Sequence, residues 1–253
     1  MTQQTSSSDE SGNSTAARSY IKLSGPDSGK FLQGQVTCDM DSLSPSNSVT
    51  GAHCTFKGRM VFLFTAHSDG DGDIILETHP SVIDSALASL KKYAVFFKTE
   101  ITDVSDSYLS SQRQLSDLER LRAGHAEVVG ETIDMFIPQM LNLDALGYLN
   151  FKKGCYTGQE IVARAHYRGA VKRRMHHLAL TIDRVPTPGD EIKNSDGKNI
   201  GNIASAVRAD DSKVEILAVI NDKYSDAIEM QIGDQALTAV THLPLPYEIP
   251  ASP

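Results

Sequence analysis

The chain has 253 residues, of which 40% are hydrophobic and 22% charged, and its formal net charge at pH 7 is −8. These values are ordinary for a globular protein that buries one large core or two modest ones. They argue against an integral membrane protein and against binding of nucleic acid through overall positive charge. The three cysteines, Cys38, Cys54 and Cys155, are odd in number and widely spaced. Their spacing argues against a disulfide framework or a four-cysteine metal site, and it favours a reducing cytoplasm.

The N-terminal half is predicted to alternate between strands and helices after a disordered, Ser/Thr-rich tail at 1–17 that lacks the features of a signal peptide. Apolar periodicity predicts strands at 20–25, 49–55, 59–67 and 74–78, a strand-rich return at 94–104, and helices at 26–33, 80–93 and 111–123. Residues 125–150 are predicted to be irregular, because Pro138, Asn142 and Gly147 interrupt their apolar patches.

The character of the chain changes after Gly169. Short alternating segments at 177–182, 200–207, 215–220, 229–232 and 236–242 are separated by turn signals, which is typical of a small β-barrel. We therefore predict a first domain over 18–171 and a C-terminal β-barrel domain over 172–253.

The segment 152–174 is strongly basic, with seven lysines and arginines against the single Glu160. This contrast with an acidic chain suggests an anionic ligand or partner at this place, although a solvated helix face would look the same. Thr157 and Glu160 have the spacing of a capping box, which predicts a helix from about Gly158. Glu160 and Arg164 have the spacing of an ion pair on that helix.

Cys155 would then lie just before a helix N-terminus and two residues after Lys153, and both features stabilise a thiolate. Such a thiol can be a nucleophile, a redox centre or a metal ligand, and the alternative is a small buried packing residue. The sequence assigns no histidine or aspartate as its base. No metal site is expected, because the histidines lack the spacing of metal ligands.

The segment KGCYTGQE (153–160), followed by Arg164, resembles the signature of the YgfZ family of folate-binding proteins, which is related to the glycine cleavage T-protein. Three further segments are similar to that family: FLQGQVTCDM (31–40), GAHCTFKGRM (51–60) and FIPQMLNLDALG (136–147). The resemblance implies an α+β fold, in which a β-rich folate-binding domain precedes a small C-terminal β-barrel. It implies a cytoplasmic factor that binds tetrahydrofolate.

The same resemblance implies a role in the assembly or repair of iron–sulfur enzymes, including the enzyme that thiomethylates tRNA. The expected partners are iron–sulfur enzymes or cluster carrier proteins, and no membrane. Direct binding of tRNA is not expected, because the chain outside 152–174 is acidic.

The chain departs from T-proteins at two places that bear on catalysis. Phe62 and Leu63 stand where T-proteins have an acidic pair, and Arg122 stands in RLRAG where they have a glutamate that reads the pterin. Aminomethyl transfer is therefore not expected, and the sequence leaves open whether the protein is an enzyme. A folate-dependent one-carbon transferase and a docking scaffold with a basic face remain the alternative functions.

The candidate site residues follow from the signature and its companion segment. Cys155 is the expected reacting residue, and the residues expected to contact the folate are Lys153, Tyr156, Gln159, Glu160, Arg164, Gln35 and Asp39. Five of these have a structural alternative. Glu160 could serve only the capping box, Asp39 could cap a helix, and Tyr156 could be a core residue. Arg164 could serve the pair with Glu160 and the helix dipole, and Lys153 could be a solvated lysine.

Overall fold

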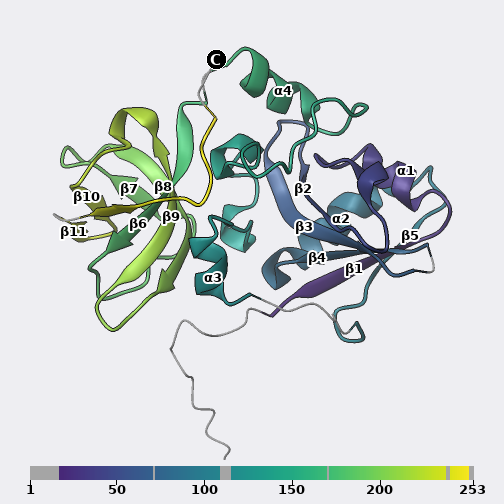
Figure 1. The fold of residues 1–253 in the computed structure, drawn as a ribbon, viewed down its shortest axis with the longest axis horizontal. Helices are drawn as coiled ribbons and strands as arrows, with labels where there is room; N and C mark the ends of the chain where they lie inside the picture. Colours follow the sequence, from purple (N-terminus) through teal and green to yellow (C-terminus); the bar gives the residue numbers. More distant parts are fainter. Residues whose placement is uncertain (1–16, 71, 109–114, 170, 238–239, 251–253) are drawn as a thin grey trace, which may run out of the picture.

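The computed structural model describes residues 17–70, 72–108, 115–169, 171–237 and 240–250. Two antiparallel sheets lie on either side of a central layer of short helices and turns, as Figure 1 shows. The tail predicted at 1–17 lies outside the described residues except for Ala17. Within the described residues, none of the helices is long and apolar enough to cross a membrane.

The first sheet has five strands in the order β2-β3-β4-β1-β5. They are β1 (Ser19–Ser24), β2 (Val49–Cys54), β3 (Met60–Ser68), β4 (Ile74–Thr78) and β5 (Glu100–Asp103). Each pair of neighbours is antiparallel. The four strands predicted from alternating apolar residues are all present, whereas only β5 forms within the return predicted at 94–104.

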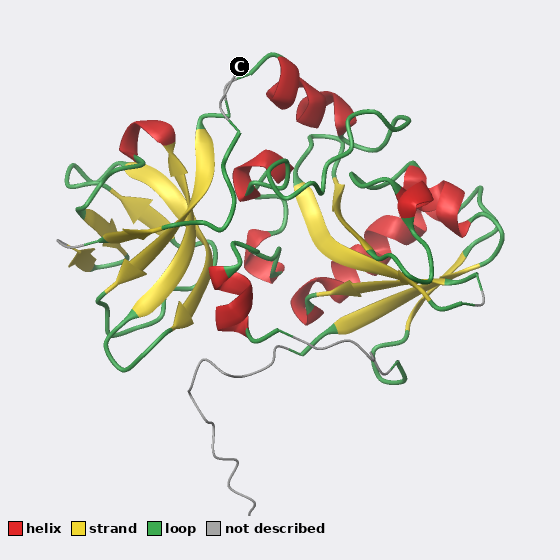
Figure 2. Ribbon diagram, viewed as in Figure 1, coloured by secondary structure: helices red, strands yellow, loops and turns green. Residues whose placement is uncertain are grey.

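The helices of the described residues are short, and only α2 reaches twelve residues. They are α1 (Ser28–Gln33), α2 (Ile83–Ala94), α3 (Asp117–Arg122) and α4 (Gln159–Tyr167). Helix α2 follows a 3-10 turn, η2 (Pro80–Val82), and packs one face of the first sheet with Ala86 and Leu90 buried (Figure 2). Helix α3 begins later than predicted, because Ser116 and Glu119 form a capping box there; residues 111–114 lie outside the described part.

The remaining short turns lie mostly where the sequence predicts irregular structure. They are η1 (Met40–Ser42), η3 (Gly130–Thr132), η4 (Pro138–Leu141) and η5 (Asp222–Tyr224). Two of them, η3 and η4, fall within 125–150. Helix α3 contacts two strands of the second sheet, β8 (Asn199–Arg208) and β9 (Val214–Asn221), so this central layer joins the two halves of the molecule.

The second sheet has seven strands in the order β11-β10-β7-β8-β9-β6-β12. Their bounds are β6 (Arg173–Leu180), β7 (Glu191–Lys193), β8 (Asn199–Arg208), β9 (Val214–Asn221), β10 (Met230–Ile232), β11 (Gln235–Leu237) and β12 (Thr241–Leu243). The strand predicted at 236–242 is divided between β11 and β12, and the short β7 was not predicted. The predicted α+β class is confirmed. The predicted small C-terminal β-barrel is present as a curled sheet that forms a half-barrel, as Figure 2 shows.

The two faces of the second sheet belong to two different cores. Leu217 and Val219 of β9 pack into the larger core with the first sheet, whereas Ile216, Ala218 and Ile220 pack into a smaller core on the opposite face. Neighbouring residues of a strand point to opposite faces, so β9 is buried on both sides. The larger core therefore runs from one sheet to the other. The boundary drawn at 171/172 stays a prediction.

Candidate functional site

The signature segment 153–160 is held by the residues of the companion segment 31–40. The Lys153 Nζ atom donates to the carbonyl oxygens of Val36, at 2.8 Å, and Cys38, at 2.6 Å. The backbone N–H of Thr157 donates to the Gly34 carbonyl at 3.2 Å, and the Thr157 hydroxyl donates to Oε1 of Gln35 at 3.0 Å. Two sequence segments more than a hundred residues apart therefore form one structural unit.

The turn between β2 and β3 closes this unit from the other side. Gly158 adopts a φ of +83°, and a β-carbon there would lie 2.5 Å from the Thr55 carbonyl oxygen. Gly58 adopts a φ of +69°, and a β-carbon there would lie 2.8 Å from Cβ of Ile161. Only glycine tolerates both the left-handed backbone and this close approach. The sequence segment 51–60 is thereby joined to the start of α4.

Helix α4 begins at Gln159, one residue later than predicted, but the predicted capping box is wrong. Gly158 occupies the cap position without a side-chain hydrogen bond, because the Thr157 hydroxyl is directed to Gln35. The predicted Glu160–Arg164 ion pair is also absent from the described residues. Both side chains are exposed. Neither a capping box nor an ion pair with Arg164 therefore explains the presence of Glu160 at this position.

Lys153 and Tyr156 form the buried side of the signature. Burial lowers the pKa of Lys153 to about 8, and its ammonium lies 5.3 Å from the centre of the Tyr156 ring. Tyr156 itself is 7% exposed, and its hydroxyl has no hydrogen-bond partner among the described residues. The Gln159 side chain accepts from the Tyr156 backbone N–H at 3.3 Å. Lys153, Tyr156, Gln159 and Gln35 therefore organise the signature from within.

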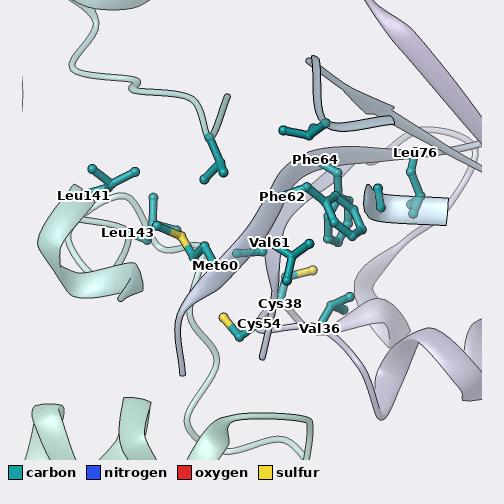
Figure 3. Close-up of a cluster of buried hydrophobic side chains, with 14 of the residues drawn as sticks. Val36, Cys38, Cys54, Met60, Val61, Phe62, Phe64, Leu76, Leu141 and Leu143 are labelled. Carbon is teal, nitrogen blue, oxygen red and sulfur yellow. The ribbon is translucent and has the colours of Figure 1, made fainter. Parts of the chain in front are cut away.

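Cys155 lies on the opposite, exposed side of the same segment. The other two cysteines are buried in the larger core, and Figure 3 shows them among Val36, Met60 and Val61. Burial raises the pKa of the Cys38 thiol and of the Cys54 thiol to about 12. Cys155 is thus the one accessible thiol of the three in the chain.

A cavity of about 600 Å³ lies beside the signature. It is bounded by Asp39, by the end of α4 and by the segment 146–152, including Lys152, which is three residues from Cys155. Its wall is rich in rings: Tyr148, Phe151, His166 and Tyr167. The Phe151 and His166 rings are stacked, with centroids 3.9 Å apart and planes 12° apart.

The Asp39 carboxylate is fixed at the wall of this cavity. It accepts from the Gln33 amide at 2.7 Å and from the Asn150 amide at 3.3 Å. It also accepts from the Asp41 backbone N–H and so caps η1, as the structural alternative expected. The Oδ1 atom of Asn150 accepts from the backbone N–H groups of Lys152 and Lys153. Asn150 thus couples the cavity carboxylate to the signature.

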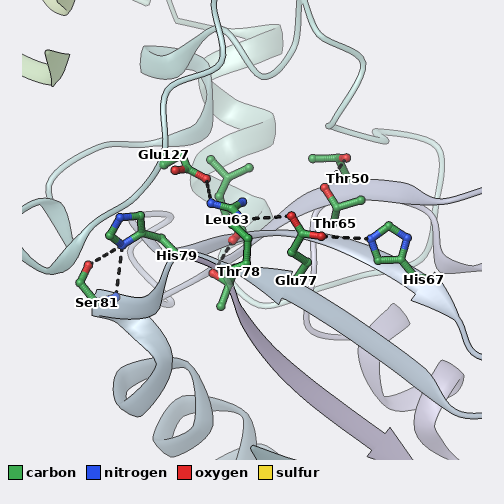
Figure 4. A network of polar contacts seen from close by, with 10 residues as sticks. Thr50, Leu63, Thr65, His67, Glu77, Thr78, His79, Ser81 and Glu127 are labelled. Atoms are coloured by element: carbon green, nitrogen blue, oxygen red, sulfur yellow. Dashed lines mark hydrogen bonds and ion pairs between the residues drawn. The ribbon is translucent and has the colours of Figure 1, made fainter. Parts of the chain in front are cut away.

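A narrower cavity of about 60 Å³ adjoins the large one, since Thr50, Leu146 and Tyr148 line both. Leu63 and Arg18 also line the narrow cavity. Arg18 donates to Glu77 at 3.0 Å and also to Glu127, and Figure 4 shows both carboxylates beside Leu63 and Thr78. The carboxylates at this end are therefore held in ion pairs with Arg18.

Arg122 lines none of these cavities. Its guanidinium binds Glu215 of β9 through both Nε, at 3.1 Å, and Nη2, at 2.6 Å, and Glu215 also contacts Nε2 of His177 at 3.0 Å. Arg122 therefore connects α3 to the second sheet.

The candidate site residues thus occupy three places. Four of them lie inside the signature unit, Asp39 lies in the cavity, and Cys155, Glu160 and Arg164 lie on the exposed side. Sequence reasoning missed Asn150 and the rings of Tyr148, Phe151 and Tyr167. The one sequence signal for them is their position: Tyr148, Asn150 and Phe151 come directly before the signature, and Tyr167 ends the helix that follows it.

Similar proteins indicate the family and the fold of the chain. No protein-family model matches the chain. The chain is 31% identical to proteins named tRNA-modifying protein YgfZ from Sodalis glossinidius and from Yersinia pseudotuberculosis, with 90% of both chains covered in each case.

The fold is similar to the crystal structure of glycine cleavage system aminomethyltransferase T from Bartonella henselae. The TM-score is 0.65 at 13% sequence identity, covering 92% of this chain and 84% of that one. At this identity the likeness concerns the fold, whereas the sequence identity to the named relatives shows the family. The chain belongs to the YgfZ family of tRNA-modifying proteins.

Proposed function

We propose that the protein binds tetrahydrofolate in the cavity of about 600 Å³ and supports the assembly or repair of iron–sulfur enzymes through Cys155. The observation that carries this proposal is the position of the cavity: its wall segment 146–152 directly precedes the signature, and Asn150 in that wall accepts from the Lys153 backbone N–H. The family membership supports a role connected with tRNA modification, and the fold supports a folate as the ligand.

The lining of the cavity fits the chemistry of a folate. Its volume lies within the usual range for small-molecule sites. A carboxylate such as Asp39 can accept hydrogen bonds from the amino and amide edge of a pterin. The Phe151, His166 and Tyr167 rings offer faces for the pterin or the aminobenzoyl ring, and Lys152 offers a cation for the terminal glutamate. When bound, the folate supplies a carrier for one-carbon units.

Cys155 can act on a partner because its thiol is exposed, while Lys153, Thr157 and Gln159 are bonded within the signature unit. One thiol cannot hold a cluster alone, but it can supply one ligand to a cluster that another protein also holds. An exposed free thiol also suits a reducing compartment, so we place the protein in the cytoplasm. The proposed partners are iron–sulfur enzymes or cluster carriers, including the enzyme that thiomethylates tRNA.

The arrangement gives less support to a one-carbon transferase. The positions expected to carry the acidic pair are Phe62 and Leu63. The carboxylates of Glu77 and Glu127 near Leu63 are engaged by Arg18. A docking scaffold that binds no folate is the other alternative. It would need the basic segment but neither Asp39 nor Cys155.

The test is complementation of a strain that lacks the protein, with tRNA thiomethylation as the readout. We expect the wild type and Gly154→Ala to restore thiomethylation and Cys155→Ala to fail at equal protein level. Gly154 is the matched control, because it neighbours Cys155, is exposed and has no other atom within 4 Å of its β-position. Full restoration by Cys155→Ala would overturn the role of the thiol.

A further inference from the structure

The outer face of helix α4 carries a basic hollow that the proposed folate cavity does not include. The residues that line it are Glu160, Ala163, Arg164, Tyr167 and Arg168, and its volume is about 550 Å³. Their spacing of three and four residues places them on one side of the helix. Arg164 and Arg168 are exposed, and neither makes an ion pair with a described residue. Two unpaired guanidinium groups, one helical turn apart, thus face the same hollow.

This hollow adjoins the cavity proposed for the folate. Tyr167 lines both, and it is the only described residue that they share. Its ring is 63% exposed and stands edge-on to His166 and Phe151, with centroids 4.7 Å and 5.9 Å away. Lys152 lines the cavity but not the hollow. A ligand that leaves the cavity past Tyr167 therefore meets the two arginines.

We propose that Arg164 and Arg168 form a subsite for the oligo-γ-glutamate tail of a folate whose pterin end occupies the neighbouring cavity. The inference rests on the proposed function and names its ligand class: folates with several glutamates rather than one. Each γ-linked glutamate has a free α-carboxylate, and guanidinium groups bind carboxylates with paired, charge-assisted hydrogen bonds. Two arginines at successive turns offer successive carboxylates a partner each.

The charges around the hollow favour one direction for the tail. Glu160 lies on the first turn of the same face and repels carboxylates, whereas Arg164 and Arg168 lie toward the end of the helix. The tail is therefore held at the end that adjoins Tyr167. Arginines near a helix C-terminus also stabilise the helix through its dipole, so a purely structural role is the alternative that the test must separate.

The test is an anaerobic calorimetric titration with tetrahydrofolate that carries one glutamate or five. We expect the wild type to bind the five-glutamate form at least about tenfold more tightly, a preference that added salt reduces. In Arg164→Gln/Arg168→Gln the preference should fall to about twofold or less, with unchanged affinity for the one-glutamate form. The control Arg184→Gln/Lys213→Gln removes the same charge from exposed turns of the second sheet, at the end of β6 and β9 away from α4, and it should keep the preference.

The other outcomes are distinguishable. Equal binding of both forms by the wild type overturns the tail subsite and leaves the folate cavity standing. An unchanged preference in the double variant, with a lower melting temperature, assigns the two arginines a structural role only. Binding of penta-γ-glutamate without a pterin as tightly as the complete ligand would show a site for an acidic partner instead. No binding of either folate overturns the proposed function and the subsite together.

Discussion

The backbones of Gly58 and Gly158 are in direct contact: a β-carbon on Gly158 would lie 3.1 Å from the Cα atom of Gly58. Gly58 ends the turn after β2, and Gly158 caps α4, so the contact joins two sequence segments that resemble the same family. The position of Cys155 depends on this junction, because the thiol lies three residues before Gly158. Backbone geometry therefore explains both glycines without any ligand.

Gly158→Ala is expected to destabilise the protein by about 1–3 kcal/mol, since the new β-carbon would be strained at a φ of +83° and would meet the Thr55 carbonyl. Gly154→Ala is the matched control in the same segment and should change the free energy of unfolding by less than about 0.5 kcal/mol. Urea unfolding of the two variants checks this. Equal stabilities would contradict the close packing at Gly158.

Lys153→Met is expected to lower the free energy of unfolding by about 1–3 kcal/mol at neutral pH, because it leaves the Val36 and Cys38 carbonyls without their donor. Lys152→Met, at an exposed neighbour, should have little effect. Thermal unfolding of both variants measures the difference. Equal loss of stability in the two would show that the hydrogen bonds of Lys153 are unimportant.

The buried ammonium also predicts a pH dependence. The pKa of Lys153 is lowered from 10.5 to about 8, so between these values the unfolded chain binds more protons than the folded protein. Stability from this group therefore rises as the pH increases from about 8 to 10.5. The stability of the wild type relative to Lys153→Met should increase across this window. A constant difference in urea unfolding would contradict the lowered pKa.

Native alkylation should modify one cysteine of the three. Cys155 is exposed, whereas burial raises the pKa of both Cys38 and Cys54 to about 12 and shields their thiols. Intact mass after iodoacetamide at pH 8 should show a single adduct, which is absent in Cys155→Ala, and three adducts in denaturant. Rapid native modification of Cys38, whose backbone borders the cavity, is the outcome that would refute this placement.

Arg122→Gln is expected to destabilise the protein by about 1 kcal/mol and to leave folate affinity unchanged, because Arg122 binds Glu215 and lines none of the cavities. The Arg122 hydrogen bonds hold the pKa of Glu215 below its ordinary value of 4.5. This stabilisation is present above that pH and is lost as the pH falls below it. The difference in unfolding free energy between wild type and variant should therefore shrink in acid, and a constant difference would contradict it.

Part of the first sheet could be predicted from the sequence because apolar and polar residues alternate, as they do from Ile21 to Ser24 in β1. The capping box at Thr157 and Glu160 was wrong because a tertiary contact, the bond from Thr157 to Gln35, took the hydroxyl that a local rule assigned to the helix. A local sequence pattern cannot predict that a distant residue binds the hydroxyl that would otherwise cap the helix.

The candidate site shows the same limit. The signature residues could be named from sequence, but Lys153 and Tyr156 are internal supports, and the cavity wall comes from rings outside the signature, such as Tyr148 and Tyr167. Asn150 links Asp39 to the signature through three hydrogen bonds, which no spacing rule predicts. The sequence does not predict that the Cys155 thiol is exposed while the neighbouring Lys153 and Tyr156 side chains support the segment from within.

The most direct test of the central claim is an anaerobic calorimetric titration of tetrahydrofolate into the wild type, Asp39→Asn and Asp41→Asn. Asp41 is the matched control, because it is an exposed neighbour that does not line the cavity. The account predicts saturable binding by the wild type and Asp41→Asn, and at least about tenfold weaker binding by Asp39→Asn, whose new amide would face donors of the pterin. No binding at millimolar ligand, or equal binding by Asp39→Asn, would contradict a folate site in this cavity.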